Sequence, residues 1–338
     1  MSRRTIIAAA IAAASLVLGA SFAAASSTGG SLKGTGSSFV FPLVSQWQAN
    51  YKGAQITYGS TSSGVGISSI TARTVDFGAS DAPMTKDQAS ACNSCQQIPW
   101  ALSATSIPYH VPGIAYGLKL TGKIIAGMYL GHITKWNNSS IKKINPGVNL
   151  PDLKVTPVYR SDASGTSFNF TDFLSKVSPE WKSKVGVGTQ PNFPTGIGGR
   201  GSSGLAGLVS RTDGAIGYVD VAYSLKNGFK FAKVQNRAGK FQLPGLRGIA
   251  AAAATITKVP SNGFISVVNP PKSQKLAYPI CTFTYVIVPL KSSKAATLKQ
   301  FVSWAITSGQ TYGPPLKFFP LPKVVRTADR AFVRKIHS

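Results

Sequence analysis

Polar and apolar residues in the first third of the chain follow a repeating order. Residues 55–58 alternate as a half-buried strand does, and they run into the Gly/Ser/Thr-rich segment 59–66. Apolar residues with helical spacing follow over 67–72, and a short apolar strand is expected over 75–81, ending at Asp81. This part of the chain therefore predicts strand, hydroxyl-rich turn and helix in succession, which indicates a parallel α/β sheet with ligand loops at the strand ends.

The same order recurs further along the chain. Val155, Val158 and Tyr159 are strand formers, and the aromatic and aliphatic residues of 168–174 have the spacing of a helix face. The turn 160–166 between them is Arg-Ser-Asp-Ala-Ser-Gly-Thr. Hydroxyl residues at a helix N-terminus direct N–H and O–H groups outward, so the turn predicts an anion site in which Arg160 pairs with the anion and Asp162 holds Arg160. An ordinary serine-capped helix with a solvent-facing arginine is the alternative.

The remaining pattern continues the α/β order. Strands are expected over 113–120, 215–219 and 282–288, helices over 43–51, 124–131, 205–209, 298–305 and 327–336, and a β-hairpin over 229–243.

The glycine-rich segment 194–204 contains the spacing of a dinucleotide-binding motif at Gly196, Gly198 and Gly201. That motif requires a strand immediately before it and an acidic ribose partner after it. Here Pro191 and Pro194 precede the glycines, and no suitably placed acid follows. The segment therefore does not predict a nucleotide site.

The N-terminus has the three parts of a secretory signal. Arg3 and Arg4 precede an apolar run, and small residues lead to an expected cleavage near Ala25. We expect residues 1–25 to be the signal, 26–33 to be a linker, and the protein to be exported to the periplasm or the extracellular cell surface. No cysteine near the cleavage region offers a lipid attachment point. An uncleaved membrane anchor is the alternative.

The chain has 338 residues and a formal net charge of +26, which falls to +24 if Arg3 and Arg4 leave with the signal. Its length suits two domains, and 43% hydrophobic residues suffice for their cores. The charge favours anionic partners, whether small molecules or polymers. The basic residues are scattered and do not alternate with aromatic residues as in nucleic-acid modules, so no specific nucleic-acid partner is expected.

The three cysteines are Cys92, Cys95 and Cys281. A small structural disulfide between Cys92 and Cys95 is expected in an oxidising compartment, with Cys281 left over. A redox motif is the alternative, although no thioredoxin-type strand and helix surround the pair. The three histidines lack zinc-ligand spacing relative to the cysteines, so neither a metal nor a cofactor is expected.

Five segments in order resemble the phosphate-binding protein of bacterial phosphate ABC transporters, a periplasmic substrate-binding protein family. These segments are 34–39, 58–66, 74–83, 160–168 and 214–219. The resemblance implies an α/β fold of two domains, each a mostly parallel sheet flanked by helices, that close like a hinged clamp on a ligand. It also implies that domain I comprises 31–101 plus 285–338 and that domain II comprises 102–284.

The resemblance further implies which groups hold the ligand. The expected phosphate-binding residues are Ser38, Phe39, Ser63, Asp81, Arg160, Ser164, Gly165 and Thr166, with Asp162 holding Arg160. Position 38 is Ser where Thr is common in the family, and the basic charge and the Cys92/Cys95 pair are not general family traits.

The resemblance implies a monomeric binding protein, not an enzyme, that takes up inorganic phosphate and passes it to membrane permease subunits. Two other classes remain as alternatives. A secreted phosphate-ester hydrolase would use the same donors, although the sequence offers neither a metal cluster nor a Ser/His/Asp set. A basic surface protein that binds anionic polymers would use the net charge instead.

Asp81→Asn is expected to weaken discrimination between phosphate and sulfate by at least about tenfold, because a carboxylate accepts hydrogen bonds and so requires a proton on the ligand. Hydrogen phosphate brings that proton, and sulfate at neutral pH does not. Titration calorimetry with both anions measures the effect. An unchanged preference would leave Asp81 the alternative role of capping the next helix.

Overall fold

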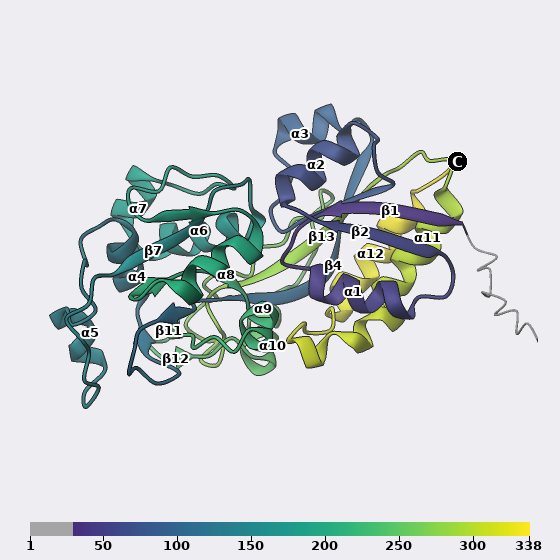
Figure 1. Ribbon diagram of the computed structural model, residues 1–338. Coiled ribbons are helices and arrows are strands. Elements are labelled where there is room, and N and C mark those ends of the chain that lie inside the picture. The colour runs from purple at the N-terminus through teal and green to yellow at the C-terminus, as the bar shows by residue number, and fades with distance from the viewer. Residues whose placement is uncertain (1–29) are drawn as a thin grey trace, which may run out of the picture.

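The computed structural model describes residues 30–338, so the expected signal and the first residues of the expected linker lie outside the described part. The chain forms two lobes, at the left and the right of Figure 1. Strand β1 already begins at Ser31, inside the segment expected to be a linker. No helix within residues 30–338 has the length and apolar character needed to cross a membrane.

One lobe contains the start and the end of the described chain. Its elements are β1 (Ser31–Gly36), α1 (Phe41–Asn50), β2 (Gln55–Ser60), α2 (Ser63–Thr71), β3 (Phe77–Ser80), α3 (Lys86–Ala91), α11 (Ala295–Ala305), the 3-10 turns Ser308–Tyr312 and Pro314–Leu316, and α12 (Lys323–Arg334). Strands β2, β1 and β3 pair in parallel in that order. Their carboxyl ends therefore meet at one edge, which faces the other lobe.

The other lobe carries the middle of the chain. Its elements are β5 (Tyr109–His110), β6 (Lys119–Leu120), α4 (Gly122–Tyr129), α5 (Ser139–Ile144), β7 (Thr156–Arg160), α6 (Gly165–Val177), α7 (Pro179–Lys184), β8 (Ile197–Gly199), α8 (Gly201–Arg211), β9 (Ala215–Ile216), β10 (Val219–Asp220), α9 (Val221–Lys226), β11 (Lys233–Gln235), β12 (Phe241–Gln242) and α10 (Leu246–Ala253). Its four-stranded sheet has the order β5-β9-β7-β8, with β7 parallel to both neighbours.

Two long antiparallel strands join the lobes. Strand β4 (Cys95–Ser106) pairs with β13 (Cys281–Pro289) along nearly its whole length, and both run from one lobe into the other (Figure 1). Every residue of β13 is buried. A strand buried on both faces needs a continuous apolar sequence, which explains why residues 282–288 were recognisable as a strand.

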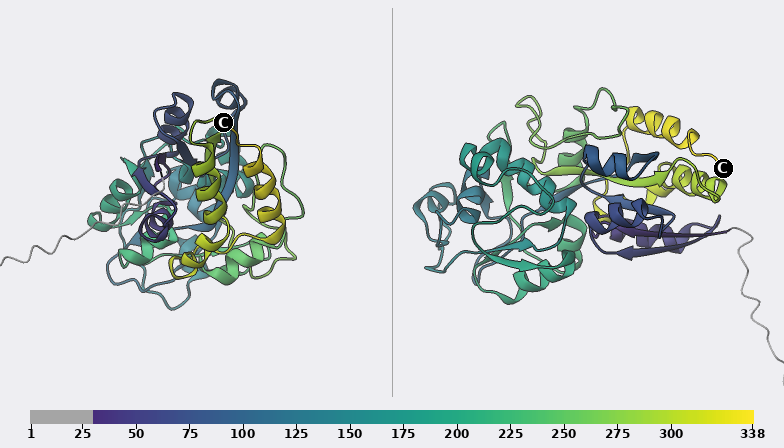
Figure 2. Two further views of the ribbon diagram at one scale, coloured as in Figure 1. Left: turned by 90° about the vertical axis from the view of Figure 1, so that its right-hand side faces the viewer. Right: turned by 90° about the horizontal axis from the view of Figure 1, so that it is seen from above.

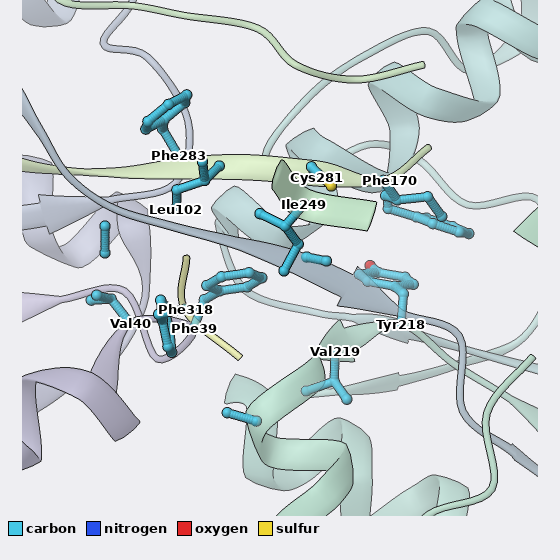
Figure 3. Packing of buried hydrophobic residues seen from close by; sticks show 14 of the residues in the cluster. Phe39, Val40, Leu102, Phe170, Tyr218, Val219, Ile249, Cys281, Phe283 and Phe318 are labelled. Carbon is cyan, nitrogen blue, oxygen red and sulfur yellow. The ribbon is translucent and has the colours of Figure 1, made fainter. Parts of the chain in front are cut away.

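The buried side chains form one main cluster that extends through both lobes. Figure 3 shows its middle, where Phe39, Leu102 and Phe318 lie on one side and Phe170 and Tyr218 on the other. The rings of Phe170 and Tyr218 stack with centroids 4.3 Å apart. The lobes therefore share a core around the crossing strands, in addition to their own packing.

Most of the expected elements are confirmed, including the helix that follows the polar turn at 160–166 and the hairpin formed by β11 and β12. The strand expected over 113–120 is wrong, because only Lys119–Leu120 is a strand. Gly113 and Gly117 both have positive φ and turn the backbone there. The C-terminal helix begins at Lys323, four residues before the expected start, directly after Pro322 at the N-cap position.

The cysteines differ in environment. Cys92 and Cys95 form a disulfide at the turn between α3 and β4, and the guanidinium of Arg73 donates to the carbonyl oxygens of Cys92 and Asn93 at 2.7 and 2.9 Å. Cys281 is free and buried. Burial raises the pKa of the Cys281 thiol, which keeps it protonated.

Asp329 lies on the buried face of α12 and has no hydrogen-bond partner for either carboxylate oxygen in the described part of the chain. Burial raises its pKa well above the ordinary value. The native state therefore holds this proton to higher pH than the unfolded chain does. The free energy of unfolding therefore falls as the pH rises from about 4, where Asp329 ionises in the unfolded chain, toward its higher pKa in the folded protein.

Asp329→Asn removes this titration and is expected to raise the melting temperature relative to the parent chain, by more at mildly alkaline than at mildly acidic pH. The expectation follows because Asn cannot ionise in the buried position. Thermal unfolding of both proteins without added ligand, followed by circular dichroism across this pH range, measures it. An equal difference at all pH values would contradict the assignment.

Candidate functional site

The polar turns predicted from the sequence meet between the lobes. Ser37 to Phe39 follow β1, Ser63 begins α2 after β2, and Asp81 follows β3. From the opposite lobe, Arg160 ends β7 and residues 164–166 begin α6. The eight expected ligand residues are all buried, including Asp81 at 2% and Arg160 at 3% exposure. Buried charges of this kind require specific partners.

Arg160 is held by Asp162 in a two-point ion pair. Its Nε donates to Oδ1 of Asp162 at 2.7 Å and its Nη2 to Oδ2 at 2.5 Å, while Nη1 donates to Ser38 Oγ at 3.4 Å across the lobes. Desolvation opposes the charge of Asp162, but the hydrogen bonds and charge of Arg160 and a bond from the Gly201 N–H outweigh it and lower its pKa. The structure therefore brings together Arg160 and Asp162 as the sequence predicted.

Asp81 is the carboxylate at the centre of the site. Its Oδ1 accepts a hydrogen bond from Ser37 Oγ, and its N–H donates to Ser63 Oγ at 3.1 Å. Burial raises the pKa of Asp81 to about 7, and the Ser37 hydrogen bond and the Arg160 charge offset only part of this rise. Thr85, not Asp81, caps the following helix.

Ser63 connects the two lobes. Its Oγ accepts from the N–H groups of Asp81 and Gly165, the latter at 3.0 Å from the opposite lobe. Next to it, the Gly64 N–H donates to the Ala163 carbonyl at 2.9 Å. A Cβ at Gly64 would lie 2.5 Å from the Cβ of Ala163, so only glycine allows this approach. These contacts define a closed arrangement of the lobes.

Of the remaining expected donors, Ser164 and Phe39 form hydrogen bonds within residues 30–338, whereas the hydroxyl of Thr166 does not. Ser164 Oγ caps α6 by accepting from the Ser167 N–H at 3.3 Å, and the Phe39 N–H donates to Ser37 Oγ at 3.1 Å. Thr166 Oγ1 is buried and has no partner in the described part of the chain. A buried hydroxyl without a partner is costly in free energy, so Thr166 identifies a position where a polar group would be stabilised.

Two residues of the site were not expected from the sequence. Ser37 supplies the hydroxyl that donates to Asp81, and Ser202 at the start of α8 lies with its Oγ 2.8 Å from Ser38 Oγ. The glycine-rich segment 194–204 was the available signal for Ser202. The segment leads into α8, whose Gly201 N–H donates to Asp162 at 3.0 Å. It thus supports the pair formed by Arg160 and Asp162.

A second buried carboxylate lies near the site. Asp220 Oδ1 accepts from the Tyr223 N–H at 2.7 Å and caps α9, while Oδ2 has no partner within residues 30–338. Burial and the Asp81 charge raise the pKa of Asp220 to about 8, although the Tyr223 hydrogen bond lowers it in part. The sequence did not indicate this residue.

A cavity of about 520 Å³ opens on the solvent side of the contact between Gly64 and Ala163. The start of α2, Asp162, and Arg200 at the start of α8 line it. The histidines lie elsewhere at the surface, where His110 pairs with Asp213 at 3.2 Å and His132 with Glu180 at 2.9 Å. Residues 30–338 contain no group of three potential metal ligands.

Comparison with known proteins gives the family. Residues 22–308 match a family model described as a PBP superfamily domain. The chain is 40% identical over 298 residues to the phosphate-binding protein PstS of Xylella fastidiosa strain Temecula1, covering 86% of this chain and 81% of that protein. It is 38% identical to the PstS of Pasteurella multocida, covering 87% of each.

Solved structures show the same fold. A phosphate-binding protein from Stenotrophomonas maltophilia has a TM-score of 0.72 at 21% identity, covering 89% of this chain and 93% of that one. A putative phosphate ABC transporter substrate-binding protein from Clostridium perfringens, solved with bound phosphate, has a TM-score of 0.63 at 18% identity and covers 86% of this chain and 100% of that one. The two-domain α/β fold expected from the sequence is confirmed, and the chain belongs to the PBP superfamily and, within it, to the PstS phosphate-binding proteins.

Proposed function

We propose that this protein binds inorganic phosphate outside the cytoplasm and delivers it to the permease of a phosphate ABC transporter. The observation that carries the proposal is the burial of Asp81 among groups that donate hydrogen bonds, contributed by both lobes. The sequence relatives named as phosphate-binding proteins support it and favour a binding protein over an enzyme.

The chemistry of the site explains how phosphate would be held. Arg160 supplies a positive charge, and its ion pair with Asp162 fixes the orientation of the guanidinium. The hydroxyl donors are Ser38, Ser63, Ser164 and Thr166. The N–H groups of Phe39 and Gly165 complete the expected donors and become available when they exchange their present hydroxyl partners for the ligand. Asp81 is the acceptor for the proton of hydrogen phosphate.

The hinge is proposed to lie in the crossing strands. The expected domain limits, 31–101 plus 285–338 and 102–284, place both boundaries within β4 and β13. The pairing register of the two strands shifts between Thr284 and Tyr285, at the second boundary. An irregular ladder is a natural place for strands to bend, which supports this division.

The remaining expectations complete the proposal. The protein acts as a monomer after export, and its partners are permease subunits in the membrane rather than nucleic acid. The sequence has neither a dense run of basic residues nor basic residues that alternate with aromatic residues, so it does not favour a nucleic-acid partner.

Titration calorimetry of the exported protein, freed of ligand by unfolding and refolding, tests the proposal directly. We expect tight one-to-one binding of phosphate at neutral pH. An absence of phosphate binding by correctly refolded protein would refute it, and hydrolysis of a generic phosphate ester with added metal ions would favour the hydrolase instead.

Gly64→Ala is expected to weaken phosphate binding at least about tenfold without removing any ligand group, because the added Cβ meets Ala163 and holds the lobes apart. Calorimetry gives the affinity, and small-angle scattering with saturating phosphate shows whether the lobes close. Gly245→Ala is the matched control, since a Cβ there meets no atom within 4 Å. Equal affinities for the two variants would contradict the closed arrangement as the binding state.

A further inference from the structure

Helix α12 presents a row of positive charges on the outside of its lobe. Its exposed basic residues, which we call the basic face of α12, are Lys323, Arg326, Arg330, Arg334 and the adjoining Lys335. None of the five forms an ion pair within 4.0 Å or a side-chain hydrogen bond within residues 30–338, and only Lys335 has a partner there, the ring of Phe332, whose centroid is 5.6 Å from its Nζ. Surface carboxylates elsewhere are mostly paired with Lys or His, as in the pairs of Asp76 with Lys294 and Asp152 with Lys135.

The helix dipole favours Arg334 and Lys335 at the C-terminal end of α12, but the rest of the row does not serve the stability of the helix. Arg326, Arg330 and Arg334 follow one another at a spacing of four residues, and like charges at this spacing repel. Lys323 and Arg326 also lie near the helix N-terminus, where the helix dipole disfavours cations. The only acid of the helix, Asp329, is buried on the opposite face and does not neutralise the row.

The opposite face of α12 fixes the row in place. Val325, Phe332 and Val333 are buried against the body of the lobe, so the helix cannot turn its apolar side outward. Figure 2 shows α12, the yellow helix nearest the C-terminus, on the outer surface of its lobe. From Lys323 to Arg334 the row extends about 16 Å along a straight helix. A flat anionic surface can therefore contact all of it at once.

The two ends of the described chain lie close together beside α12. Lys294 Nζ donates to the Ser31 carbonyl at 3.0 Å, and the His337 N–H donates to the Leu290 carbonyl at 2.7 Å. The first strand and the end of α12 therefore lie at the same end of the lobe (Figure 2). A protein that is expected to be exported through a membrane is released beside a bilayer, and the row on α12 is complementary in charge to the anionic lipids of such a surface.

We propose that the basic face of α12 docks the protein, without insertion, on an anionic phospholipid bilayer. Each Lys or Arg near such a surface strengthens binding by roughly fivefold, so a row of several basic residues gives weak and reversible attachment. Salt weakens the contact because the charges are exposed. Docking would keep the protein near membrane-embedded partners while leaving the site between the lobes untouched.

Vesicle co-sedimentation of the exported protein tests this inference. The vesicles contain phosphatidylcholine either alone or mixed with phosphatidylglycerol. We expect binding only to the anionic vesicles, and at least tenfold weaker binding for the variant R326Q/R330Q/R334Q. The variant R326K/R330K/R334K keeps the charge and is expected to bind as the parent does.

A matched control separates the row from the overall charge. The variant R211Q/R237Q/R247Q removes three exposed arginines from other elements and leaves the same net charge as the first variant. Its vesicle binding is expected to stay within about twofold of the parent, and phosphate titration verifies that all variants are folded. Equal losses for the two glutamine variants, or no vesicle binding by the parent, would overturn the proposal. Loss of heparin binding with vesicle binding retained would likewise overturn it, and would assign the row to a soluble polyanion.

Discussion

The burial of the Asp81 carboxylate between two lobes is the constraint on which the site depends. A carboxylate in this position is desolvated, and Ser37 and Arg160 compensate only part of the loss, so its pKa rises to about 7. Every other expected ligand group can donate a hydrogen bond, whereas ionised Asp81 can only accept one. The ligand that suits the site is therefore an oxyanion that carries a proton. Under the proposed function, this requirement distinguishes phosphate from sulfate by protonation, because the two anions have nearly the same shape.

The rest of the fold keeps these groups in place. Asp162 fixes the direction of the Arg160 guanidinium, and Asp162 is itself positioned by the N-terminus of α8. The crossing strands β4 and β13 carry both lobes on one buried core, and the proposed hinge lies near the middle of these strands. Closure then depends on close backbone contacts such as that between Gly64 and Ala163. Small residues in the turns are thus required by geometry as well as by hydrogen bonding.

Much of this organisation could be predicted from the sequence because the polar turns follow parallel strands, whose carboxyl ends meet at one edge. Arg160, Asp162 and Asp81 could be identified in this way together with the family resemblance. Ser37 and Ser202 could not, because their roles arise from contacts between distant segments, and the glycine-rich segment 194–204 indicated only the region of Ser202 and not its contact with Ser38. The prediction of a strand over 113–120 was wrong because apolar residues of this segment are buried although the backbone turns at Gly113 and Gly117. In the sequence, Asp220 looks like an ordinary acid after a strand and Asp329 like an ordinary acid in a helix, and only the three-dimensional packing shows that they are buried.

The pH dependence of sulfate binding tests the central claim most directly, because protonation converts Asp81 from an acceptor into a donor without any mutation. We predict that the native protein binds sulfate poorly above pH 7 and progressively better as the pH falls below the Asp81 pKa of about 7. Phosphate should remain the stronger ligand at neutral pH. Sulfate binding that is equally strong on both sides of this pKa, or that weakens on acidification, would contradict the account of Asp81 as the group that demands a proton from the ligand.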